Sequence, residues 1–484
     1  MSRLDRTGNG LPSRPQTLRS WIALLVLVSV VKLLAGMLLI PDTPAVPDEG
    51  LYAFLVEGLA RGDAIDRLAS DAGGYSSDVI VGSWLLVGPA TSIHTLGIDA
   101  LLSVRLVALV LSVTATVLVL LVAHRSRPHG IPLASPAGVA LLVLLLLPSY
   151  QIWGTLALRE SSTILSMVVT AWGLSLLALR PTRLTQIVGL VALFAGAVGM
   201  YLSRSYLALV LSAAVVAAFL LPPLRGRGLI TVGAIGALVV GNYVGLEIRA
   251  AAPPPIVPSS AVVETPSSEN PTREPVASSA DEPVASSADV QEPLGSSEAS
   301  EASEASEATE SILAVIDSRV GNLYSTREGL RQNAESAYPS NYCSATSDAI
   351  STLTCEAVHL PVGIYRFLLT PNLVDTEADA PPQRLAAGVE NLIWLAIFVA
   401  AGASVVARRS RSPRLTVFLV TLLVLSTVAY ALVSGNEGTA FRHKGQFLWA
   451  WCLLIVLGTG WRSWVRSLRR TKQPADSVSH SVGS

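Results

Sequence analysis

Two adjacent carboxylates stand near the beginning of the chain. The segment reads PDEGLYAFLVEGLARG, in which Asp48 and Glu49 begin an amphipathic helix whose face includes Tyr52. Ionisable groups at the edge of an apolar bundle are costly, so Asp48 and Glu49 are candidate functional residues. Acidic side chains are also favoured at helix N-termini, where they accept hydrogen bonds from unpaired amides, and capping is therefore the alternative interpretation.

Basic side chains recur at the ends of apolar segments that are far apart in the sequence. Guanidinium groups fit phosphate oxygens because their donors form a planar fork, so converging arginines predict a site for a lipid phosphate or pyrophosphate. The alternative is that each arginine extends separately to lipid head groups. The candidate phosphate-binding residues are Arg105, Arg159, Arg204, Arg442 and Lys444.

Four further residues are expected to assist these groups. Lys32 lies inside the first apolar segment, where a charge is costly, and we expect it to contact either substrate or a neighbouring helix. Glu160 follows Arg159 directly and is alternatively its local ion-pair partner. The full set of assisting residues is Lys32, Tyr52, Glu160 and His443.

Familiar soluble-enzyme motifs and metal motifs are missing from the sequence. It has no glycine loop ending in GK[ST], no HExxH and no G-x-S-x-G. The six histidines form no convincing metal site, so none is predicted, and the need for a cofactor or divalent metal is left open. Cys343 and Cys355 are close enough in sequence to predict a disulfide in an oxidising compartment, whereas Cys452 stands alone.

The composition indicates that a bilayer is the solvent of this chain. Hydrophobic residues make up 51% and charged residues 14%, and the mean hydropathy is +0.53. Charged residues of soluble domains usually approach a quarter. We therefore predict an all-α polytopic membrane protein of about ten helices, since several apolar runs cover a hydrocarbon core about 30 Å thick. The predicted spans are 21–40, 103–123, 132–149, 161–179, 186–202, 206–221, 229–246, 386–407, 415–434 and 446–460.

The distribution of charge predicts the direction of these spans. Every loop on the side of the termini is basic, with Arg125 and Arg127 as one example, and basic loops mark the cytoplasmic side. Both termini are then inside, and the candidate site residues gather outside. The predicted cytoplasmic ends are 1–20 and 462–484, and the two membrane blocks are 21–250, with about seven helices, and 386–461, with about three.

A long insertion separates the two membrane blocks and is predicted to lie outside. Residues 251–310 contain a tandem EPVASSAD repeat and a SEA run, and this acidic, Ser/Ala/Pro-rich stretch is expected to be disordered. It is interpreted as a spacer, with a specific binding tail as the alternative. Residues 311–385 return to ordinary composition and are expected to form a small ordered cap, with a helix beginning SILAVID and an amphipathic segment LPVGIYRFLLTP near the membrane surface.

About the first 220 residues resemble the multispanning GT-C glycosyltransferases, in particular the bacterial relatives of protein mannosyltransferases and aminoarabinose transferases. The resemblance is carried by PDEGLYAFLVEGLARG, LLSVRLVALVLSVTATVLVLLVAHR and PSYQIWGTLALRESSTILSMVV. LPVGIYRFLLTP and GNEGTAFRHKGQF are similar to membrane proteins of bacterial exopolysaccharide assembly. The low-complexity insertion and the lack of a large soluble C-terminal domain depart from the GT-C pattern.

The resemblance implies a fold, a reaction and partners. In GT-C enzymes an acidic residue of the first outer loop is the proposed base, which corresponds here to Asp48, with Glu49 beside it. The implied donor is a sugar on polyprenyl phosphate, and the implied acceptor is a cell-envelope glycan or lipid. We expect an inverting transferase in the bacterial cytoplasmic membrane, with its active face outside, in contact with membrane lipids and with no nucleic-acid partner.

Two other functions stay open at this point. A polysaccharide polymerase that joins lipid-pyrophosphate repeat units would depend mainly on the outer arginines. A transporter or flippase of lipid-linked sugars would form no bond, and is expected to show repeated halves and paired charges in mid-membrane, which the unequal membrane blocks do not favour. The identity of the sugar, the acceptor and the linkage cannot be read from these residues.

Overall fold

The computed structural model describes twelve stretches of the chain, and everything below concerns them. They are residues 17–39, 47–71, 82–154, 156, 158–179, 182–221, 234–244, 349–371, 382–406, 410, 412–434 and 436–458. Their regular structure is helical, apart from an isolated antiparallel bridge between Ser410 and Gly458. The predicted all-α class is confirmed.

Five helices are long and apolar enough to cross a membrane, which confirms a multispanning membrane protein. They are α6 (Ala100–Ser126), α9 (Glu160–Ala178), α10 (Arg183–Ser203), α15 (Pro382–Val406) and α16 (Pro413–Val433). Four shorter apolar helices lie over other predicted spans: α7 (Pro136–Leu146), α11 (Ser205–Leu220), Ala234–Val244 and α18 (Leu448–Leu457). The helix α1 (Leu18–Leu39) covers the first predicted span. A total of about ten spans and the direction of the chain stay predictions.

Close helix packing at the centre depends on small residues. A Cβ added to Gly196 of α10 would stand 2.1 Å from Thr170 Oγ1 of α9, and one added to Gly173 would stand 2.8 Å from the Gly189 carbonyl. Only glycine permits this approach, as is usual where membrane helices pack through small residues. The buried hydroxyl of Thr170 donates to the Ser166 carbonyl at 3.0 Å, so it is satisfied within its own helix.

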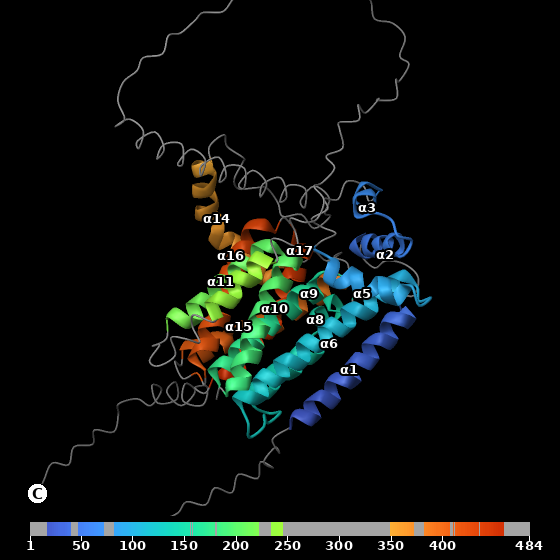
Figure 1. Ribbon diagram of the computed structural model, residues 1–484. Coiled ribbons are helices and arrows are strands. Elements are labelled where there is room, and N and C mark those ends of the chain that lie inside the picture. The colour runs from blue at the N-terminus through green and yellow to red at the C-terminus, as the bar shows by residue number, and fades with distance from the viewer. Residues whose placement is uncertain are drawn as a thin grey trace, which may run out of the picture.

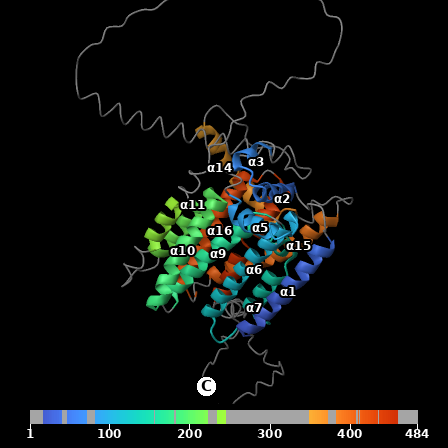
Figure 2. The ribbon, with the colours of Figure 1, turned by 45° about the vertical axis from the view of Figure 1, so that its right-hand side comes forward.

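Several short helices and the longer α14 gather at one end of the bundle, where α9 begins (Figures 1 and 2). They are α2 (Pro47–Ala60), α3 (Ile65–Asp71), α5 (Trp84–His94), α8 (Pro148–Trp153), α14 (Ala349–Leu369) and α17 (Glu437–Gly445). The predicted helix after Asp48 is α2, and its Tyr52 and Leu55 are buried against α5 and α6. All but the last two residues of the segment LPVGIYRFLLTP belong to α14, which packs on α16 and α17. The helices α3, α5, α8 and α17 were not predicted.

Arginines of the predicted inner loops bind the carbonyl ends of helices. Arg125 donates to the Leu179 carbonyl at 3.0 Å. Arg127 donates to the carbonyls of Val456 and Gly458 at 2.7 and 2.8 Å. Cations are favoured at helix C-termini, so these two arginines stabilise the ends of α9 and α18 in addition to any topological role.

Some predictions fall outside the described residues. These are the disordered stretch 251–310, the helix beginning SILAVID, the two chain ends and Cys343. Cys355 lies on α14 and is disulfide-bonded, whereas Cys452 is a buried free thiol in α18.

Candidate functional site

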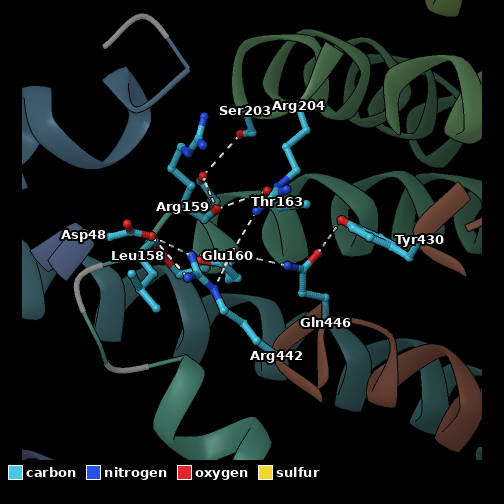
Figure 3. A network of polar contacts seen from close by, with 12 residues as sticks. Asp48, Leu158, Arg159, Glu160, Thr163, Ser203, Arg204, Tyr430, Arg442 and Gln446 are labelled. Carbon is cyan, nitrogen blue, oxygen red and sulfur yellow. Dashed lines mark hydrogen bonds and ion pairs between the residues drawn. The ribbon is translucent and has the colours of Figure 1, made fainter. Parts of the chain in front are cut away.

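Glu160 is the centre of a buried charged cluster at the end of the bundle (Figure 3). It is the first residue of α9 and is fully buried. Its Oε1 accepts hydrogen bonds from Arg204 Nη2 at 2.8 Å, from Arg442 Nε at 2.9 Å and from Gln446 Nε2 at 3.4 Å. The start of α9 is also tied to the end of α10 by the Ser203 and Ser162 hydroxyls, 3.1 Å apart. The start of α9, the end of α10 and the helix α17 with its C-cap are therefore fixed around one carboxylate.

Arg442 connects this buried carboxylate to the accessible Asp48. Its Nη1 and Nη2 both donate to Asp48 Oδ2 at 3.1 Å, while its Nη2 lies 2.8 Å from Glu160 Oε1. The Asp48 side chain is 38% exposed, whereas that of Glu160 is 0% exposed. Burial alone lowers the pKa of Arg442, but Glu160 and Asp48 raise it above its usual value overall. Asp48 is thus the carboxylate of this cluster that a substrate can reach.

Glu49 faces a different helix from its neighbour Asp48. Its two carboxylate oxygens accept from Arg105 Nε at 3.0 Å and Arg105 Nη2 at 2.8 Å, and it is fully buried. This bidentate pair joins the start of α2 to α6. The adjacent acidic residues therefore differ in position: Glu49 holds α2, and Asp48 lies in the charged cluster.

Arg204 is held between the carboxylate and two tyrosines. Its Nη1 donates to the Tyr206 hydroxyl at 2.8 Å, and the Tyr206 hydroxyl donates to that of Tyr430 at 3.4 Å. The Tyr430 hydroxyl in turn donates to Gln446 Oε1 at 3.1 Å. Burial lowers the pKa of Arg204, but Tyr206, Tyr430 and Glu160 raise it overall, well above its usual value. The guanidinium is therefore charged.

Arg159 contributes a positive charge without a carboxylate of its own. Its backbone carbonyl accepts the hydroxyls of Ser162 and Thr163 at 2.8 and 3.0 Å, which places it at the first turn of α9. Its half-buried guanidinium makes no hydrogen bond or ion pair within the described stretches. It still acts electrostatically on Tyr52 and His443. The cluster thus holds Arg159, Arg204 and Arg442 against Asp48 and Glu160, an excess of one positive charge.

Buried polar atoms without partners mark the same cluster. Glu160 Oε2, Arg204 Nε and His443 Nδ1 have no hydrogen-bond partner in the part of the chain that the structure describes. Buried polar groups are normally hydrogen-bonded, so these three atoms can still form hydrogen bonds with a polar ligand. The His443 ring lies 4.2 Å from the Tyr430 ring, and burial together with Arg204 and Arg442 holds the pKa of His443 well below its usual value.

The ammonium of Lys444 lies outside the charged cluster, although Lys444 was predicted to be one of the phosphate-binding residues. Its Nζ donates to the Leu368 carbonyl at 3.1 Å and to Asn391 Oδ1, and the residue is 1% exposed. Burial lowers its pKa to about 7, partly opposed by the Glu390 carboxylate. Arg105 also binds elsewhere, to Glu49.

Two of the assisting residues differ in how near they lie to the cluster. The buried Tyr52 hydroxyl hydrogen-bonds Ser83, and its pKa is raised by burial, with Arg159, Glu160 and Asp48 acting on it. Lys32 lies within α1 and has no hydrogen-bond or ion-pair partner among the residues described. Tyr52 therefore borders the site, whereas no interaction among the described residues links Lys32 to it.

Sequence reasoning missed three neutral members of the site, Tyr206, Tyr430 and Gln446. Tyr206 follows Arg204 by two positions, and a tyrosine at the start of an apolar helix is only a weak signal in the sequence. In the structure its side chain is 43% exposed. Tyr430 and Gln446 lie in otherwise apolar stretches and carry no charge that would single them out. Their role appears only from the hydrogen bonds to the charged residues.

No known protein family, curated protein or solved structure matches this chain. Within the described stretches, no group of three or more His, Cys, Asp or Glu residues is placed to hold a metal ion. The site is therefore interpreted from its own geometry.

Proposed function

We propose that this chain is a membrane glycosyltransferase that moves a sugar from a polyprenyl-phosphate donor to a cell-envelope acceptor. The proposal includes a GT-C-like arrangement of about ten spans with both termini inside a bacterial cytoplasmic membrane and the charged cluster outside. The observation that carries it is a cluster in which the carboxylate of Asp48 is accessible and in which Arg159 supplies a positive charge beyond those balanced by carboxylates. A base and an anion site are the two parts that such a transfer needs.

Asp48 is the proposed general base. It takes the proton of the acceptor hydroxyl while the acceptor oxygen attacks the anomeric carbon, and the bond from that carbon to the phosphate oxygen breaks with inversion. The donor phosphodiester carries one negative charge, and the departing polyprenyl phosphate carries two. Arg442 keeps Asp48 ionised before the reaction, because an ion pair favours the charged carboxylate.

Arg159 and Arg442 are the proposed phosphate-binding groups. Arg159 has donors to spare, and Arg442 lies beside the base, so both can neutralise the charge that develops on the leaving phosphate. Glu160 and Arg204 position Arg442, and the Glu49–Arg105 pair positions α2. Preorganised charges of this kind need little rearrangement during the reaction.

The charge balance favours a single phosphate over a pyrophosphate. A cluster with one excess positive charge matches the single charge of a phosphodiester donor, whereas a lipid pyrophosphate diester carries two. For this reason the polymerase of lipid-pyrophosphate repeat units is the second proposal. A flippase that forms no bond is the third.

A comparison of donors tests the proposal. The purified full chain in nanodiscs is given a radiolabelled sugar on polyprenyl phosphate, or a labelled repeat unit on polyprenyl pyrophosphate, together with an envelope lipid and glycan extract. We expect labelled product and released polyprenyl phosphate from the first donor. Stepwise elongation of the repeat unit would establish the polymerase instead, and movement of labelled lipid between leaflets without a covalent product would establish the flippase.

A further inference from the structure

The short helix α17 carries cations into two separate polar clusters. Arg442 points to Asp48 and Glu160, while Lys444, two residues later, points to α14 and α15. Residues two apart on a helix do not share a face, so one helix of nine residues reaches both sides. The position of Arg442 thus depends on what holds the opposite face of α17.

The contacts of Lys444 join α17 to the end of α14 and to α15. Nζ donates to the Leu368 carbonyl near the end of α14 and to Asn391 Oδ1 on α15. It also lies 5.4 Å from the centre of the Trp394 ring and 4.8 Å from that of Phe441. Cations are attracted to aromatic faces, so each neighbour of the ammonium holds it in the same place.

The neighbours of Lys444 are themselves fixed. Asn391 Nδ2 donates to the Pro371 carbonyl, just beyond α14. Glu390 accepts from the Ser149 amide at 3.2 Å, from the Ser149 hydroxyl, and from Trp394 Nε1 at 3.2 Å. This second cluster therefore connects α8, α14, α15 and α17.

A buried ammonium is an expensive way to make such a connection. Charges in the interior of a helical bundle cost free energy, and an apolar residue of similar size would avoid that cost. Lys444 is 1% exposed, and no carboxylate lies within ion-pair distance of it among the described residues. Its directional contacts are what an apolar side chain would not provide.

We propose that Lys444 is a positioning residue, which ties α17 to α14 and α15 and thereby holds Arg442 against Asp48 and Glu160. The tie between the helices does not depend on the proposed function. Only the effect of Lys444 on the binding of a lipid phosphate rests on it. It makes α14 and α15, which follow the long insertion, part of the support of the site.

The charge state of Lys444 offers a way to examine this tie. Burial lowers its pKa to about 7, and the Glu390 carboxylate raises it in part. Glu390 on α15 is the ionisable group that acts on Lys444. The other helices in contact with α17 carry Arg366 on α14, Tyr150 on α8 and Tyr430 on α16, and α17 itself carries Arg442 and His443.

The first test does not depend on any substrate. The Trp394 emission of the full chain in nanodiscs is obtained as the difference between wild type and Trp394→Phe, and is titrated from pH 5.5 to 9. We expect a transition with a midpoint near the pKa of Lys444, lost in Lys444→Met and kept in the control Arg67→Met, whose side chain is 74% exposed. A transition that survives in Lys444→Met would overturn the tie.

The second test asks whether Lys444 acts through Arg442. The probe is a sugar on a short-chain prenyl phosphodiester, whose charge does not change between pH 6 and 9. Lys444→Met is expected to weaken its binding about tenfold, the scale of one charge-assisted hydrogen bond, and to have less than about a twofold effect in an Arg442→Leu background. Asn391→Leu, which removes the acceptor and keeps the lysine, is expected to act in the same direction.

Two outcomes of the second test separate this inference from the proposed function. If Lys444→Met weakens binding equally with and without Arg442, Lys444 does not act through Arg442, and the positioning role is wrong. If wild type does not bind the probe but the Trp394 transition is present, the proposed function fails and the tie between the helices stands.

Discussion

Arg442 Nη2 lies 2.8 Å from Glu160 Oε1, although the two residues are 282 positions apart in the sequence. This contact brings the second membrane block, which follows the long insertion, onto the first. Through the same guanidinium, Glu160 is linked to Asp48 near the beginning of the chain. The charged cluster therefore forms only when both blocks are folded together.

Glu160→Gln is expected to destabilise the fold strongly. The substitution leaves Arg204 and Arg442 near each other without the buried charge that both bind, and breaking a buried ion pair costs about 3 to 5 kcal/mol. Unfolding by SDS in mixed micelles measures the change. Glu57→Gln is the matched control, because Glu57 is 51% exposed and its contact with Arg61 is a surface pair worth at most about 1 kcal/mol. Equal stability of the two variants would contradict the central place of Glu160.

Glu49 and Arg105 are expected to depend on each other. Either Glu49→Gln or Arg105→Gln leaves a buried group unpaired and lowers the free energy of unfolding by about 3 to 5 kcal/mol. The double variant is expected to lose less than the sum, because neither charge is then left alone. The exposed pair Arg67 and Asp71 provides the control cycle, with a coupling of at most about 1 kcal/mol. Additive losses at Glu49 and Arg105 would argue against a positioning pair.

The helices were predicted better than their contacts. The predicted spans 161–179 and 186–202 match α9 and α10 to within a few residues, because apolar runs of this length are visible in composition alone. The helix α17 was missed because it is short and polar, and α5 because Pro89 interrupts a brief apolar run. Neither has the length that makes a span recognisable.

Charge was the signal that predicted which distant side chains meet. Asp48, Arg204 and Arg442 were expected to converge, and the structure brings them together through Glu160. The alternative of a local ion pair between Arg159 and Glu160 was suggested only by their adjacency in the sequence. Adjacency is a poor guide, because neighbouring residues on a helix do not face each other. The divergence of Asp48 and Glu49 has the same cause, since which face of α2 meets α6 is decided by packing.

Arg159→Met is expected to impair substrate binding more than folding. Its guanidinium has no carboxylate to leave unpaired in the described stretches, so the free energy of unfolding is expected to change by less than about 1 kcal/mol. Loss of a hydrogen bond to a charged phosphate costs about 1.5 to 3 kcal/mol, or roughly a 10- to 150-fold loss of affinity for a prenyl phosphodiester sugar. Arg67→Met is the control. Unchanged affinity in Arg159→Met would remove it from the phosphate site.

The buried His443 is expected to make the folded protein less stable in acid. Burial and the charges of Arg204 and Arg442 hold its folded pKa well below 6.5, so the unfolded chain binds more protons than the folded chain once the pH falls below about 6.5. Its contribution to stability is then expected to fall by up to about 1.4 kcal/mol per pH unit. Unfolding followed between pH 7.5 and 5 is expected to show a smaller acid loss in His443→Asn than in wild type. His129→Asn, at an exposed position, is the control. If His443→Asn loses as much stability in acid as wild type, the assignment of His443 as buried and neutral is wrong.

The transfer activity of Asp48→Asn tests the central claim most directly. The labelled sugar released from polyprenyl phosphate is measured for wild type, Asp48→Asn and the exposed control Asp71→Asn, with donor affinity measured in parallel. We expect Asp48→Asn to lose roughly 100- to 10,000-fold in transfer rate, the usual contribution of a general base, while it still binds donor and folds. Wild-type transfer by Asp48→Asn would contradict the assignment of Asp48 as the base.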